Sequence, residues 1–278
     1  MKILICVSKL PYARHTLHFG GLIASLEPSQ VTVLTVIDGP GERPSAEATL
    51  SEAQATLNLP DTNTKMRQGS PAGEIVREAN AGQYDIVVIG DHVLHGFFDR
   101  FLPTVTHKVA DRTGATVLIV KEQPAALQRI LICTSGRKID KPVVSMGAKL
   151  AREATAVATL LFVADPIPAM YAGLGSMEET LPTLLQSNTP LARHLNWATA
   201  RLQAEGVTNR LLMRRGIITD EIALEALSGD YDLVIIGGRA GSNIWNDLFV
   251  GNITPQIVDK APCSVLIVRT KADKKKKP

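Results

Sequence analysis

Cysteine is scarce in this sequence, and its three cysteines form no CxxC pair. Cys6, Cys133 and Cys263 each stand inside an apolar run. This pattern favours reduced, buried thiols over a disulfide scaffold. A signal-peptide-like apolar region and an apolar stretch of membrane-spanning length are also missing. We therefore expect a soluble, cytoplasmic protein with no membrane partner.

The body of the chain has no excess of positive charge. The 278 residues include 30 Lys and Arg against 27 Asp and Glu, and the four lysines at 274–277 account for the whole net charge of +3. A nucleic-acid-binding protein generally needs a positive face, so we expect no nucleic-acid partner and a basic, disordered tail at 272–278. With 45% hydrophobic residues, the chain is long enough for two domains with separate cores.

Motifs of the common catalytic classes are absent as well. The sequence contains no GxxxxGK[ST] loop, no GxGxxG, no HExxH and no nucleophile elbow. These absences argue against a kinase or a dehydrogenase, and no side chain is predicted to be catalytic. Slow hydrolysis of a bound nucleotide stays open.

Histidines are concentrated in the first half of the chain. His15 with His18, and His92 with His95, have spacings that would allow each pair to share a metal ion. Scattered polar residues on a solvated rim are the simpler interpretation. The sequence therefore predicts no metal ligand.

The two halves of the chain repeat one another. Residues 2–6 (KILIC) return as 129–133 (RILIC), an offset of 127, and residues 84–90 (YDIVVIG) return as 231–237 (YDLVIIG), an offset of 147. About twenty extra residues must therefore lie between Asp165 and Gly216. The inserted stretch, 166–190, is rich in apolar residues, and we interpret it as a lid or as an inter-domain packing segment.

Each half alternates short, continuous apolar runs with segments of helical spacing. In the first half the runs predict five strands, at about 2–7, 31–37, 64–67, 85–89 and 116–120. Runs buried on both faces are typical of parallel sheets covered by helices. The sequence predicts two tandem, doubly wound α/β domains, each a five-stranded parallel sheet with helices on both faces, at 1–123 and 127–271.

One helix of the second half is predicted in more detail. Thr219 lies at a helix start, and the pattern Ile222, Leu224, Ala226 and Leu227 predicts the apolar face of that helix.

The fourth strand of the second half runs into a glycine-rich loop. Gly238 and Gly241 are three residues apart, Gly251 follows ten residues later, and a helix is predicted from Thr254. Glycine lets phosphate oxygens approach the backbone, and a helix start presents free N–H groups to an anion. In an open parallel sheet, ligands bind beyond the carboxyl ends of the strands, where this loop lies.

This loop and the repeated strands resemble the universal stress protein family, in its tandem two-domain type, with an adenine-nucleotide α-hydrolase-like fold. The resemblance implies ATP or AMP as the ligand, with or without Mg²⁺, bound only in the second domain. The residues implied to bind it are Ser135, Val163, Gly238, Arg239, Gly241, Ser242, Gly251, Asn252, Ile253 and Thr254.

The chain departs from the family pattern at several of these positions. Asn252 stands where the family has a hydroxyl, and Ser8 and Ser135 stand where nucleotide-binding members carry an Asp after the first strand. In the first half, Pro103 replaces the close-approach glycine and Asp91 would repel a phosphate, so we expect that half to hold no triphosphate.

Three functions follow from this resemblance. The first is a nucleotide-binding regulatory protein with an unknown protein partner, built as an internal pseudo-dimer that could also form a homodimer. The second is a nucleotide-free tandem scaffold for protein–protein interaction, and the third is a weak ATPase.

Overall fold

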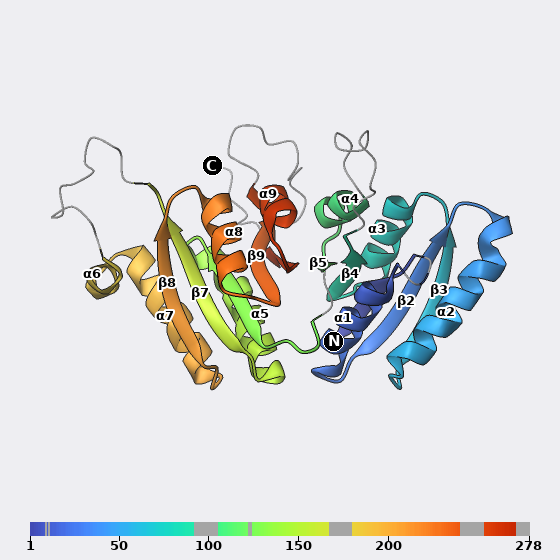
Figure 1. Cartoon of the computed structure of the whole chain (residues 1–278), viewed down its shortest axis with the longest axis horizontal. Helices are drawn as coiled ribbons and strands as arrows, with labels where there is room; N and C mark the ends of the chain where they lie inside the picture. The colour runs from blue at the N-terminus through green and yellow to red at the C-terminus, as the bar shows by residue number, and fades with distance from the viewer. Residues whose placement is uncertain are drawn as a thin grey trace, which may run out of the picture. The chain divides into compact units, whose positions relative to one another are not determined.

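The computed structural model describes residues 1–8, 10, 12–91, 105–121, 124–166, 180–239 and 253–270 (Figure 1). Among them, two compact units are formed, one by residues up to 126 with 264–267, the other by residues 127–239, 253–263 and 268–270. Over the part of the chain described, no helix is long and apolar enough to span a bilayer.

The first unit is built on parallel strands. They are β1 (Lys2–Cys6), β2 (Gln30–Ile37), β3 (Thr62–Gln68), β4 (Ile86–Gly90) and β5 (Thr116–Val120). Their order is β3-β2-β1-β4-β5, and all four neighbouring pairs are parallel. Residues 265–267 of β10 (Ser264–Thr270), which belong to this unit, pair with β5 in the antiparallel direction. The five predicted strands are confirmed, with bounds within two residues of the prediction.

The second repeat has the same topology. Its strands are β6 (Arg129–Thr134), β7 (Val157–Ala164), β8 (Asn209–Arg215) and β9 (Leu233–Arg239). Their order in the sheet is β9-β6-β7-β8, and β10 is the neighbour of β9 on its other side. β6 pairs in parallel with both β7 and β9. Because the chain moves from β6 outward to β8 and then returns to the other side of β6, the strand order reverses next to β6. This is the topological switch point, where doubly wound sheets bind ligands.

Helices cover both faces of each sheet, as the sequence predicted. In the first unit, α1 (Arg14–Ser25) and α2 (Arg43–Leu57) contact each other on one face, and α3 (Pro71–Gly82) and α4 (Val105–Arg112) contact each other on the other face. In the second unit the corresponding pairs are α5 (Lys141–Ala154) with α7 (Pro190–Ala204), and α8 (Ile218–Ser228) with α9 (Ile253–Lys260). Central strands such as β5 are fully buried between these layers, which explains their continuous apolar runs, whereas the edge strand β3 is largely exposed and polar.

The predicted apolar face of α8 is wrong in part. Ile222 and Ala226 are buried, but Leu224 is 53% exposed and Leu227 is 68% exposed. The inward face instead includes Glu225, whose carboxylate is buried among charged and phenolic donors. Residues 222, 225 and 226 share a face at three- and four-residue spacing, which places Leu224 and Leu227 on other sides of the helix.

The inserted segment begins after β7 and contains one further helix, α6 (Leu181–Gln186). β7 matches β2 at an offset of 127 and α7 matches α2 at an offset of 147, so the extra residues lie between these two elements. Leu184 of α6 packs in a core cluster with Phe162 and Leu195. The described part of the insertion therefore packs inside the second unit, while its residues 167–179 lie outside the described residues.

A buried carboxylate with cationic partners recurs in both units. In the first, Glu78 of α3 is 2% exposed and accepts hydrogen bonds from Lys65 (2.7 Å), Arg67 (2.5 and 2.9 Å) and Tyr84 (3.0 Å). Burial by itself would raise the pKa of Glu78, but these hydrogen bonds outweigh it and lower the pKa to about 2. The cluster fastens α3 to β3.

The second unit repeats this arrangement on α8. Glu225 accepts hydrogen bonds from Arg210, Arg214 and Tyr231. Tyr231 matches Tyr84, and Glu225 matches Glu78, at the offset of 147. The cluster is therefore a structural element of the repeat and marks neither unit as the functional one.

Candidate functional site

The structure brings the described part of the predicted nucleotide site to one edge of the second sheet. Ser135 follows the end of β6, Val163 lies near the end of β7, and Gly238 and Arg239 end β9. Ile253 and Thr254 form the start of α9, where Thr254 is buried. The other four predicted residues, Gly241, Ser242, Gly251 and Asn252, lie outside the described residues.

The loop after β6 is organised by one carboxylate oxygen. Asp140 Oδ2 accepts hydrogen bonds from the Ser135 hydroxyl (2.6 Å), the Ser135 backbone N–H (2.7 Å) and the Thr134 hydroxyl (3.2 Å). Asp140 is the residue before α5, where an Asp usually caps the helix, yet it makes no side-chain cap hydrogen bond. Its carboxylate is directed to the loop instead.

His194 of α7 is the remaining member of this hydrogen-bond network. Its Nε2 lies 2.9 Å from Thr134 Oγ1, and the imidazole is only 3% exposed. Thr134 has one hydroxyl proton, which goes to Asp140 because a carboxylate can only accept. The His194 Nε2 must then carry the proton that it donates to Thr134 Oγ1. The other ring nitrogen, Nδ1, is buried without a hydrogen-bond partner.

The surroundings favour the neutral form of the His194 imidazole. Burial lowers the pKa of His194, Asp140 opposes this effect, and Lys141 adds to it. The imidazole stands 5.7 Å from the Trp197 ring, and the Lys141 ammonium lies 4.6 Å over the same Trp197 ring. A neutral imidazole in a fixed tautomer therefore holds the Thr134 hydroxyl in place.

Sequence reasoning missed Thr134, Asp140 and His194. Asp140 is five residues beyond Ser135, and His194 is sixty residues from Thr134 on a helix, so no short motif joins them. One signal was available in the repeat, because the counterparts of Thr134 and Asp140 at an offset of 127 are Val7 and Ala13. The polar residues are therefore specific to the second half.

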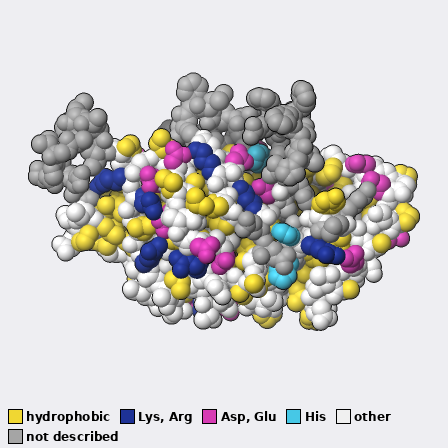
Figure 2. Space-filling model, viewed as in Figure 1, with side chains coloured by type: hydrophobic (Ala, Val, Ile, Leu, Met, Phe, Trp, Pro, Cys, Tyr) yellow, Lys and Arg dark blue, Asp and Glu magenta, His cyan; other side chains and the backbone are white. Residues whose placement is uncertain are grey.

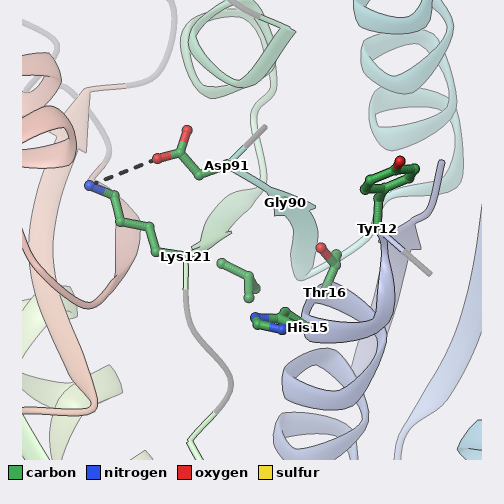
Figure 3. A pocket seen from close by; sticks show the side chains of 7 residues that line it. Tyr12, His15, Thr16, Gly90, Asp91 and Lys121 are labelled. Atoms are coloured by element: carbon green, nitrogen blue, oxygen red, sulfur yellow. Dashed lines mark ion pairs between the residues drawn. The ribbon is translucent and has the colours of Figure 1, made fainter. Parts of the chain in front are cut away.

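The corresponding edge of the first unit carries different side chains. A cavity of about 320 Å³ opens there, lined by Tyr12, His15, Thr16, Gly90, Asp91, Val120 and Lys121. In Figure 3, Asp91 at the end of β4 faces Lys121 after β5, and their ion pair spans 3.8 Å. Asp91 stands where the second half has Gly238. A carboxylate thus lies where the predicted loop of the second half presents glycine.

The described residues hold no cluster of three or more potential metal ligands. His15 and His18 lie on α1, whereas His92 and His95 fall outside the described residues. All three cysteines are free thiols, and burial raises the pKa of Cys133 well above its usual range. Cys133 is therefore a poor nucleophile.

This architecture defines the class of protein: a tandem α/β protein with a doubly wound sheet and polar groups at its switch point. The model of the universal stress protein family matches residues 1–121 and 126–269. The chain belongs to the universal stress protein family.

Known proteins show the same organisation. A universal stress protein from Methanothermobacter thermautotrophicus is 25% identical over 144 residues, which are 51% of this chain and 96% of that protein. The crystal structure of a universal stress protein from Archaeoglobus fulgidus DSM 4304 has a TM-score of 0.73 at 16% identity, covering 97% of this chain and 96% of that chain. A half-length universal stress protein from Archaeoglobus fulgidus, in complex with dAMP, has a TM-score of 0.37 at 15% identity, covering 52% of this chain and 98% of that chain.

Proposed function

We propose that this protein is a regulatory protein that binds ATP or AMP, with or without Mg²⁺, in its second domain at residues 127–271. The first domain, residues 1–123, serves as its structural partner. Nucleotide occupancy would change the order of the loop from Gly238 to Thr254 and hence the exposed surface, which a protein partner in the cytoplasm would recognise. This proposal extends family membership to a specific ligand and a specific domain.

The observation that supports it most strongly is the asymmetry between the two repeats. At the switch point of the second unit, exposed Ser135, the end of β9 at Gly238 and the first turn of α9 lie on one edge. Backbone N–H groups at a helix start favour a phosphate, and an exposed hydroxyl can bind a nucleoside. The first unit instead has an ion pair between Asp91 and Lys121 at this edge. Asp91 would repel a phosphate.

The residues present fit an adenine nucleotide in chemical terms. Gly238 allows close approach of the ligand to the backbone, Thr254 lies in the first turn of α9, and Ser135 supplies a hydroxyl oxygen. The Asp140 carboxylate already accepts hydrogen bonds from Ser135 and Thr134, and this role is structural. We therefore assign these residues to binding and give none of them a catalytic role.

The test is to denature freshly purified protein and identify released nucleotides by ion-pair chromatography. We expect near-stoichiometric ATP or AMP from the wild type and none from Gly238→Asp/Gly251→Glu. Pro103→Glu is the matched control, because Pro103 corresponds to Gly251 at the offset of 148. It should release as much nucleotide as the wild type. A wild type that releases none, and whose melting temperature does not change with millimolar Mg-ATP, would refute the proposal.

A second candidate, the scaffold, is favoured by the outer face of α8. Ile217, Leu224 and Leu227 are 66%, 53% and 68% exposed, and Figure 2 shows hydrophobic side chains gathered over this helix among charged ones. Their counterparts in the first half, at the offset of 147, are Ser70, Arg77 and Asn80. Apolar side chains thus replace polar ones on one repeat only, as expected for an interaction surface.

Analytical ultracentrifugation tests whether this face joins two copies of the chain. We expect a concentration-dependent dimer that Leu224→Glu/Leu227→Glu abolishes and Arg77→Glu/Asn80→Glu leaves intact. A wild type that is monomeric at all concentrations would exclude self-association through α8.

A further inference from the structure

The loop after β6 has a hydrogen-bond arrangement that determines how Ser135 can act. The Ser135 hydroxyl has a single proton, and that proton is directed to Asp140 Oδ2 over 2.6 Å. The oxygen of Ser135 can then only accept further hydrogen bonds. Since the Ser135 side chain is exposed at the switch point, its lone pairs are available to a ligand.

We propose that Asp140 makes Ser135 an acceptor-only group that binds a sugar hydroxyl of the nucleotide, and that His194 is a positioning residue that holds this arrangement through Thr134. The inference rests on the proposed nucleotide binding and specifies which part of the ligand the β6 loop recognises. The negative charge of Asp140 acts on the ligand indirectly, because the hydrogen bond to the carboxylate increases the acceptor strength of the serine oxygen.

The burial of His194 supports a positioning role over simple packing. The imidazole is 3% exposed, and leaving its Nδ1 without a partner destabilises the folded state. A leucine would fill comparable space without this cost. What an apolar side chain could not supply is the Nε2–H that Thr134 accepts at 2.9 Å. The histidine is therefore explained by its hydrogen bond.

Thr134 links the two ends of the network. Its hydroxyl donates to Asp140, while its oxygen accepts from His194 and from the Gly136 backbone N–H at 3.1 Å. Removal of this one hydroxyl would leave the His194 and Gly136 donors without an acceptor and remove a donor from Asp140. The loop that carries Ser135 would then lose its fixed geometry.

The first repeat provides an internal comparison. Its counterparts of Thr134, Asp140 and His194 are Val7, Ala13 and Glu47, at offsets of 127, 127 and 147. Ser8 is retained where the second half has Ser135, but no carboxylate stands at the position of Asp140. The arrangement is therefore confined to the second unit, in which Gly238 stands at the position of Asp91.

Isothermal titration with AMP and with 2′,3′-dideoxy-AMP, which lacks both sugar hydroxyls, tests this inference. We expect the wild type to bind AMP about tenfold more tightly than the dideoxy analogue, the loss expected for one hydrogen bond to a polarised acceptor. Ser135→Ala should reduce this ratio to about one. Thr134→Val and His194→Leu should reduce it to about two, whereas the conservative Thr134→Ser and His194→Gln should preserve it.

The ratio separates a positioning role from a general loss of stability. Leu202→Ala, in the same helix as His194 and also fully buried, should lower stability and weaken both ligands without changing their ratio. If the wild type binds AMP but all variants keep its ratio, the inference is wrong and the proposed nucleotide binding stands. If the wild type binds neither ligand, the proposed function fails and the inference fails with it.

Discussion

The ionisation of Glu78 should control the stability of the first unit in acid. Its carboxylate is buried beneath α3 and accepts hydrogen bonds from Lys65, Arg67 and Tyr84. Glu78→Gln keeps the size of the side chain and removes the charge. The Arg67 guanidinium and the Lys65 ammonium would then lose their buried anionic partner, and breaking such an ion pair is destabilising.

The magnitude follows from the pKa. The folded state lowers the pKa of Glu78 from 4.5 to about 2, which corresponds to at most about 3 kcal/mol of unfolding free energy at neutral pH. The Lys65 side chain is 49% exposed and that of Arg67 is 28% exposed, so solvent screening reduces the expected contribution to about 2 kcal/mol. Since the folded pKa is depressed, this contribution is complete above pH 4.5 and is lost as the pH falls toward 2.

Urea unfolding, with peptide-level hydrogen exchange to assign each transition to a unit, measures this effect. We expect Glu78→Gln to destabilise the first unit by about 2 kcal/mol at pH 7, with the difference from wild type disappearing near pH 2. Glu52→Gln is the control, because Glu52 pairs with Arg14 over 3.9 Å and both side chains are more than half exposed. Its cost should be under about 0.5 kcal/mol. Equal losses in the two variants, or a Glu78→Gln difference independent of pH, would refute the reasoning.

Three further predictions concern the second unit. Because burial lowers the pKa of His194 below 6.5, its contribution to stability is complete above pH 6.5 and declines as the pH falls; acid unfolding profiles of His194→Gln should lack this decline. Gly136→Ala should cost about 2 kcal/mol of unfolding free energy, because φ is +75° and a Cβ would collide with a leucine of α7. Gly206→Ala is the control: φ is +72°, but the Cβ would stand in open space, so the cost should be about 1 kcal/mol. Urea titrations of the two variants measure the difference. Single Leu224→Gln and Leu227→Gln substitutions should change the melting temperature by less than about 2 °C, because both side chains are exposed; a loss of several degrees would show that they pack.

Most of the fold could be predicted because buried parallel strands appear in the sequence as continuous apolar runs. The repeat gave each strand twice, and the 127 and 147 offsets located the insertion, which the structure places between β7 and α7. The face of α8 could not be predicted in the same way. Glu225 is buried because Arg210, Arg214 and Tyr231 surround its carboxylate, and a pattern that counts only apolar residues assigns such a position to solvent.

Site residues that rest on a backbone pattern could be proposed from the sequence, whereas the side-chain network formed by distant elements was missed. Gly238 and Thr254 follow from the glycine loop after a fourth strand. Asp140 and His194 meet Thr134 only because η3 (Lys138–Asp140) and α7 converge on the end of β6. A lone histidine inside a helix carries no signal of that meeting.

The two repeats share their buried carboxylate clusters and differ in the groups at the carboxyl edge of the sheet. Both units have a buried carboxylate cluster, at Glu78 in the first and at Glu225 in the second, and each links a helix to its own sheet. The edge groups differ: Thr134 and Asp140 correspond to Val7 and Ala13 in the first repeat, and Gly238 corresponds to Asp91. Folding alone does not require a buried histidine with an unpartnered nitrogen, and the first repeat has Glu47 at the corresponding position. The cost at His194 is understandable if the second unit alone must hold its β6 loop in a single arrangement for a ligand.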